Sequence, residues 1–158
     1  MSLKNFTIDN GFFNITKTNK YDAIKELIDY LYNIYPLNID KETLISQLYK
    51  REKTRSTSIG MGFSIPHTRI ENLDNEKILW GINKNGIEYD SIDNKPVYTI
   101  ILLLSPVDPM FTNVHIKTLS NITHMLSYSE ITEQFHNIST YQDLITTLEY
   151  ADNKYLLS

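Results

Sequence analysis

Apolar side chains recur at helical spacing along the first third of the chain. Between residues 21 and 35 they stand three or four positions apart, which predicts an amphipathic helix that ends before Pro36. Asp40 is a favourable N-cap residue for a second helix, which the same spacing extends to about Arg51. The chain therefore opens with a pair of helices, each with one apolar face to bury.

Apolar and β-branched residues gather into short runs in the middle of the chain, at residues 63–65, 78–82 and 97–104. Runs of this length and composition predict strands. The last run is β-rich and apolar, as is typical of a central strand buried on both faces. Asn85-Gly86 is a strong turn signal and predicts a hairpin between the second run and residues 87–89.

Helical spacing returns in the last third of the chain. Asn113 can cap a helix that extends to about residue 126, and Ser139-x-x-Gln142 has the form of a capping box that opens a final helix. Helices at both ends with strands between them predict an α/β (α+β) layered domain, with helices packed on one mixed β-sheet. The length of 158 residues fits a single domain over residues 1–158.

Composition narrows the classes of function. The chain has no cysteine, which excludes disulfide frameworks, thiol catalysis and cysteine zinc sites. The net charge is −4 and Lys and Arg form no long run, so we expect no nucleic-acid partner. The longest apolar run, Ile100–Leu104, is too short to span a bilayer, and the first residues carry no secretory pattern. We therefore expect a cytoplasmic protein with no direct membrane insertion.

His67 has the most informative context among the four histidines of the chain. Pro66 before it lacks an amide donor and has a fixed φ, and it pushes Ile65 to an extended conformation. This geometry ends a strand and projects the imidazole from its tip. On these residues alone two interpretations stay open: a reactive histidine, or a strand-end turn with an incidental one.

Other side chains suit an anion, although each also has an ordinary structural interpretation. His115 lies in the first turn of its predicted helix, where a neutral ring can donate to a bound phosphate, but a solvated first-turn residue is the simpler interpretation. The guanidinium of Arg51 fits a phosphoryl group in bidentate fashion, or it simply ends a helix where a cation suits the dipole. The hydroxyls of Ser56, Thr57 and Ser58 suit an anion or an ordinary turn.

Familiar signatures of other chemistries are absent from the sequence. There is no Gly-x-x-x-x-Gly-Lys loop, His-Glu-x-x-His pair or Gly-x-Ser-x-Gly elbow, so no standard nucleotide, metal or serine-hydrolase site is indicated. A histidine, an arginine, hydroxyls and a second histidine remain. That set suits a histidine that becomes phosphorylated, because imidazole nitrogen is nucleophilic near neutral pH and the other groups neutralise phosphoryl oxygens.

The segment that ends at His67 is similar to a family signature. Residues 51–67 read Arg-Glu-Lys-Thr-Arg-Ser-Thr-Ser-Ile-Gly-Met-Gly-Phe-Ser-Ile-Pro-His. This run resembles the active-site signature of type-2 EIIA domains, in the fructose, mannitol and nitrogen-regulatory branch of the bacterial phosphoenolpyruvate-dependent sugar phosphotransferase system. Residues 86–97 resemble the middle of that family, and residues 115–122, His-Ile-Lys-Thr-Leu-Ser-Asn-Ile, resemble a helix start in it. The resemblance extends over about residues 20–150.

The resemblance implies a phosphotransferase that works through a phosphohistidine intermediate. The family takes a phosphoryl group from phosphohistidine on the carrier HPr and gives it to a cysteine or histidine of an EIIB partner. By resemblance, His67 is the phosphorylated residue, Arg51 and His115 line the same pocket, and Thr57 is a further member. No metal or nucleotide cofactor is implied, because the donor already carries an activated phosphoryl group. The implied fold is a mixed central β-sheet flanked by helices on both faces.

Two roles within this family stay open. One is an EIIA component that serves sugar uptake. The other is a regulatory module in which the phosphorylation state of His67 controls binding to a regulator or transporter. Thr68 and Ser64 depart from residues common in the family and bear on the identity of the sugar more than on activity. Because no EIIB, EIIC or DNA-binding segment is found, we expect a stand-alone component or a lone regulatory one. The apolar residues considered for a partner-binding rim, of which Phe63 is expected in the core, are Met61, Phe63, Met110 and Phe111.

Overall fold

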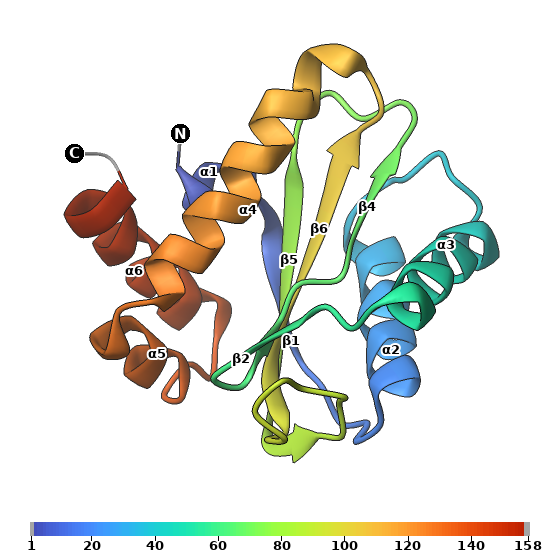
Figure 1. Ribbon diagram of the computed structural model, residues 1–158. Coiled ribbons are helices and arrows are strands. Elements are labelled where there is room, and N and C mark those ends of the chain that lie inside the picture. The colour runs from blue at the N-terminus through green and yellow to red at the C-terminus, as the bar shows by residue number, and fades with distance from the viewer. Residues whose placement is uncertain (1, 157–158) are drawn as a thin grey trace.

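A mixed β-sheet lies at the centre of the molecule, with helices on both of its faces (Figure 1). The computed structural model describes residues 2–156. The strands are β1 (Thr7–Asn14), β2 (Ser58–Gly60), β3 (Phe63–Ser64), β4 (His67–Ile70), β5 (Lys77–Ile87) and β6 (Val97–Pro106). The helices are α1 (Leu3–Phe6), α2 (Lys20–Ile34), α3 (Lys41–Thr54), α4 (Thr112–Leu126), α5 (Ser129–Phe135) and α6 (Tyr141–Ala151), with a 3₁₀ turn η1 (Pro109–Phe111) and a π-helical turn η2 (Asp152–Leu156). The predicted layered α/β architecture is confirmed.

The strand order is β1-β5-β6-β3-β2, and β4 also pairs with β6. β5 and β6 are antiparallel, whereas β3 and β4 both run parallel to β6. These two short strands follow one another along the same edge of β6, with Pro66 between them. Pro66 has no amide to donate, but its carbonyl accepts a hydrogen bond from the amide of Leu103 at 3.0 Å. The proline thus interrupts the strand and sets the point at which β4 starts, at His67.

Two apolar cores fill the two faces of the sheet. Helices α1, α4, α5 and α6 cover one face, and α2 and α3 cover the other (Figure 1). Along β6, Ile101 and Leu103 point into the first core while Ile100 and Leu102 point into the second. All four of these side chains are at most 1% exposed, which agrees with the prediction of a central strand buried on both faces.

The two helices predicted near the start of the chain are present as α2 and α3. Asp40 caps α3 as predicted, because its carboxylate accepts a hydrogen bond from the amide of Thr43 at 3.1 Å. The capping box of the final helix lies one residue later than predicted, at Thr140 and Asp143. Within residues 2–156, no helix is both long enough and apolar enough to cross a membrane.

The cap predicted at Asn113 is wrong. The carboxylate of Asp108 accepts a hydrogen bond from the amide of Met110 at 2.9 Å and starts η1, which continues directly into α4. Pro109 at the first position of that turn has its φ already set for a helical start. Asn113 therefore lies inside the first turn of α4, and His115 stands two residues further into the helix than a cap at Asn113 implies.

The hairpin predicted at Asn85-Gly86 is also wrong, because β5 continues through both residues to Ile87, which pairs with Val97. Gly86 has a φ of 91°, and the register of the β5–β6 ladder shifts between Ile82 and Ile87. The positive φ that suits glycine in a tight turn here forms a bulge inside a long strand.

Strand β1 has no counterpart among the predicted strands. Its burial runs in pairs of residues instead of alternating, so the period-two signal of a half-buried strand is missing. The ladder to β5 is irregular between Thr7 and Phe12, where the sequence contains Asn10-Gly11. The strand forms because β5, far along the chain, supplies its pairing partner.

Replacing Gly86 by alanine tests the bulge. A Cβ at this position would lie 3.2 Å from the Cβ of Pro96, and alanine would have to adopt the positive φ of residue 86. Gly86→Ala should therefore lower the free energy of unfolding by about 1–3 kcal/mol. The exposed neighbour Asn85 provides the control, since Asn85→Ala should change stability by less than about 0.5 kcal/mol. Chemical denaturation measures both, and equal losses in the two variants would contradict the assignment.

Candidate active site

His67 is held by the backbone just before it. The residue opens β4 directly after Pro66, and its Nδ1 lies 2.7 Å from the carbonyl oxygen of Ile65. A carbonyl oxygen only accepts hydrogen bonds, so Nδ1 carries the ring proton and donates it. Nε2 therefore carries the lone pair of the neutral ring. The tautomer of His67 follows from this contact with the backbone two residues before it.

The surroundings of His67 favour its neutral form. Burial lowers the pKa of the imidazole below its ordinary value, and the positive charges of Arg51 and His115 lower it further. The Ile65 carbonyl and the Glu52 carboxylate act in the opposite direction and only partly offset these effects on the pKa. At neutral pH the ring is uncharged, so the lone pair on Nε2 is available as a nucleophile.

His115 lies beside His67, with 5.7 Å between the two ring centroids. His67 pairs with Leu103 on β6, whose side chain points into the core beneath α4, and Ser105 follows two positions later on the same face. The Nδ1 of His115 lies 2.5 Å from the Oγ of Ser105. The sequence resemblance expected the two histidines in one pocket, and the structure brings their rings together.

Arg51 reaches the site from the last turn of α3. Its Nη1 donates to the carbonyl oxygen of Arg55 at 2.8 Å, which holds the side chain against the end of its own helix. Its charge is close enough to His67 to lower the pKa of that ring. Arg51 is thus a cation at the end of a helix, and its positive charge also acts on the imidazole of His67.

Thr57 lies next to the strand that carries His67, because its carbonyl accepts the amide of Ile65 at 3.0 Å. Its hydroxyl donates to the Glu52 carboxylate, and its own amide donates to Glu52 Oε2 at 3.0 Å. A hydroxyl has one proton, so Thr57 does not donate to an anion in this arrangement. The structure thus ties Thr57 to the interior of the loop, beside the strand that leads to His67.

Glu52 is the residue of this network that the sequence did not reveal. It is 2% exposed, and besides Thr57 it accepts a hydrogen bond from the hydroxyl of Tyr89 at 2.5 Å, with Lys20 Nζ 3.7 Å away. Burial and the neighbouring Glu52 charge raise the pKa of Tyr89 well above its ordinary range, so the phenol stays a donor. These contacts fix the loop between Arg51 and Thr57.

The remaining histidines stand apart from this group. The ring of His124 packs on Tyr128, with centroids 5.3 Å apart, and that of His136 packs on Tyr98 at 6.1 Å. The ring contacts of these two histidines are with tyrosines, whereas those of His67 and His115 are with each other.

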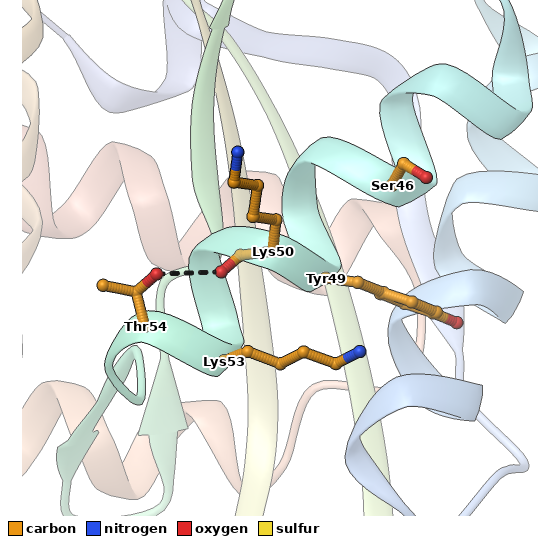
Figure 2. A pocket seen from close by; sticks show the side chains of 5 residues that line it. All are labelled: Ser46, Tyr49, Lys50, Lys53 and Thr54. Atoms are coloured by element: carbon orange, nitrogen blue, oxygen red, sulfur yellow. Dashed lines mark hydrogen bonds between the residues drawn. The ribbon is translucent and has the colours of Figure 1, made fainter.

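A separate hollow of about 410 Å³ lies on the surface of α3, lined by Ser46, Tyr49, Lys50, Lys53 and Thr54 (Figure 2). The ammonium groups of Lys50 and Lys53 point in different directions from the helix, and the hydroxyl of Thr54 donates to the Lys50 carbonyl at 3.0 Å (Figure 2). The lining residues thus present no converging set of polar groups, and the hollow shares no residue with the site around His67.

The sequence matches a model of a known protein family over most of its length. Residues 4–151 match the model described as phosphoenolpyruvate-dependent sugar phosphotransferase system, EIIA 2. The chain belongs to this family. The match covers the whole sheet and both of its helical layers, so this EIIA domain contains every element that builds the site.

Known proteins similar to this EIIA domain include a sugar-transport component and nitrogen regulatory proteins. It is 27% identical over 139 residues to the fructose-specific EIIABC component of Bacillus subtilis. The aligned region covers 88% of this chain but only 21% of that longer protein. It is 30% identical over 120 residues to a nitrogen regulatory protein of Klebsiella oxytoca, covering 73% of this chain and 70% of the relative. The crystal structure of nitrogen regulatory protein IIA-Ntr from Neisseria meningitidis has the same fold, with a TM-score of 0.81, 22% identity and coverage of 92% of this chain and 98% of that one.

The charge of Arg51 predicts a measurable shift in the titration of His67. Because a neighbouring positive charge disfavours the imidazolium ion, Arg51→Gln should raise the pKa of His67, and the native ring should titrate below about 6.5. Lys53→Gln removes an exposed charge from the same helical turn and should leave the pKa nearly unchanged. NMR titration of the His67 ring measures all three proteins. A lowered or unchanged pKa in Arg51→Gln would contradict this placement of the charge.

Proposed function

We propose that this EIIA domain accepts a phosphoryl group on Nε2 of His67 from the carrier HPr and passes it to an EIIB partner. The observation that carries the proposal is the hydrogen bond from His67 Nδ1 to the Ile65 carbonyl, which leaves Nε2 unprotonated in a neutral ring. Membership of the EIIA family supports phosphoryl transfer as the reaction class. The domain acts in this proposal as a phosphotransferase with a phosphohistidine intermediate.

Both steps use the same arrangement of the ring. In the first, the lone pair of His67 Nε2 attacks phosphorus while the bond from phosphorus to the donor histidine of HPr breaks. No proton has to leave His67, because Nε2 carries none. In the second, a nucleophile on EIIB attacks phosphorus and His67 departs as a neutral imidazole, since Nδ1 keeps its proton on the Ile65 carbonyl. The pinned tautomer therefore makes His67 both a nucleophile and a good leaving group.

The neighbours of His67 have separate roles in this proposal. Arg51 and His115 stabilise the charge that develops on the phosphoryl oxygens, because both bring positive charge close to the ring. Thr57 acts through Glu52 as a positioning residue, holding the loop that follows Arg51. The proposed transfer involves no metal or nucleotide.

The surface beside His115 suits a partner protein. Met110 is 71% exposed and Ile116 is 59% exposed, at the start of α4 on either side of His115 in the sequence. Phe63 is 2% exposed and belongs to the core, as expected. Met61 is exposed, but the next residue, Gly62, is hydrogen-bonded to Tyr98 on β6. Tyr98 lies five residues along β6 from the residue that pairs with His67, which is roughly 17 Å at the rise of a strand. Met61 is therefore left out of the proposed rim.

A regulatory role is the second candidate, and the nitrogen regulatory relative supports it. In that role the phosphorylation of His67 changes the charge of the surface around Met110 and Ile116, so that one state binds a target protein and the other does not. The chemistry at His67 is the same in both roles. They differ in whether the phosphoryl group travels on to EIIB.

Incubation with phosphoenolpyruvate, enzyme I and HPr tests the carrier function. Mass spectrometry should find one acid-labile phosphoryl group on the peptide that contains His67, and His67→Ala should remove it. His136→Ala, which alters a histidine packed on Tyr98, is the matched control and should keep the full label. No label on the native protein, or full label on His67→Ala, would refute the proposal.

Mixing the phosphorylated domain with EIIB proteins separates the two roles. A transport component should lose its label to a cognate EIIB within the time of the assay. A regulatory module should keep its label in the presence of every EIIB tested and bind its target in only one phosphorylation state.

A further inference from the structure

A second buried carboxylate, Glu76, lies behind His115. Glu76 and Ser105 are both 0% exposed. The hydroxyl of Ser105 donates to Glu76 Oε2, and the Nδ1 of His115 lies 2.5 Å from the Ser105 Oγ. The other carboxylate oxygen, Glu76 Oε1, has no hydrogen-bond partner and lies 3.8 Å from the His115 Nδ1. The three side chains thus form a continuous path from the interior to the site.

The hydrogen bonds of this path have a defined direction. The single proton of the Ser105 hydroxyl goes to the carboxylate, so the Ser105 oxygen accepts from the Nδ1–H of His115. Nδ1 is thereby occupied, and Nε2 is the ring nitrogen left for the space beside His67. The two histidines are pinned in the same way, His67 by a backbone carbonyl and His115 by a hydroxyl backed by a carboxylate.

The three groups come from different parts of the fold. Glu76 directly precedes β5, and the β5–β6 ladder pairs Lys77 with Leu104, which brings Glu76 next to Ser105. His115 reaches them from the first turn of α4. A buried carboxylate with an oxygen left unpaired is costly unless positive charge lies near it. The ring of His115 is placed to supply that charge when it is doubly protonated.

We propose that Glu76 and Ser105 are positioning residues for phosphoryl transfer. They hold the His115 ring with a proton on Nδ1. When Nε2 takes a second proton from solvent, the charge of Glu76 balances the ring, and Nε2–H donates to an oxygen of the phosphoryl group on His67. His115 gives up no proton in the transfer. The bond from phosphorus to His67 Nε2 forms as the bond to the donor breaks. This inference rests on the proposed phosphocarrier function and deepens it.

Ser105→Ala tests the path, with two readouts. Ring ¹⁵N shifts of His115 in the unphosphorylated protein report which nitrogen carries the proton, and the native protein should show it on Nδ1. In Ser105→Ala that preference should be lost, and transfer from HPr to His67 should slow about tenfold, as expected for a hydrogen bond to a charged group. Thr99→Val is the matched control, because it removes a hydroxyl that is 2% exposed on the same strand. It should leave both readouts unchanged.

Glu76→Gln provides a second variant that keeps the shape of the side chain and removes its charge. It should slow transfer by a similar factor while the ring signals of His67 stay in place, and it decides the matter if Ser105→Ala does not fold. Unchanged His115 signals together with native transfer rates in the folded variants would overturn the inference. Absence of any phosphoryl transfer to the native protein would instead refute the proposed function, while the His115 shifts would still test the hydrogen-bond path.

Discussion

The chemistry of this domain depends on one hydrogen bond, from the Nδ1 of His67 to the carbonyl of Ile65. The accepting carbonyl lies two residues before the ring, at the point where Pro66 interrupts the pairing between β3 and β4. The same bond sets the tautomer and leaves the lone pair on Nε2, and in the proposed transfer it lets the ring leave as a neutral group. The sheet contributes by holding both sides of the interruption on β6, through pairing of residues 63–64 with 99–100 and of residues 67–70 with 103–106.

Two buried carboxylates support the groups around that histidine. Glu52 gathers Thr57, Tyr89 and Lys20 and so fixes the loop after Arg51. Glu76 lies behind His115 through Ser105. Burying a carboxylate is unfavourable unless donors or positive charge surround it, so each acid stabilises a particular local arrangement of its neighbours. Arg51 and His115 thus both act on the ring of His67, and a buried acid supports the surroundings of each.

The sequence was informative wherever a local rule acts alone. The Asp40 cap, the central strand and the end of a strand at Pro66 follow from neighbouring residues, and they are present in the structure. His115 had no distinguishing local signal, and only the family resemblance placed it in the pocket. Asn85-Gly86 was misread because a glycine with positive φ serves a bulge as well as a turn, and only the distant Val97 decides between them. Glu76 was missed because its partner Ser105 stands 29 positions away, and the burial of Glu52 depends in part on Tyr89, 37 positions away, although Thr57 is near it in the sequence.

The most direct test of the central claim is the position of phosphorus on the ring of His67. NMR of the phosphorylated domain with ¹⁵N-labelled histidine identifies the bonded nitrogen through its coupling to ³¹P. The hydrogen bond to Ile65 predicts coupling at Nε2, with a proton still on Nδ1. Coupling at Nδ1 would contradict the account, because that nitrogen could then no longer donate to the Ile65 carbonyl.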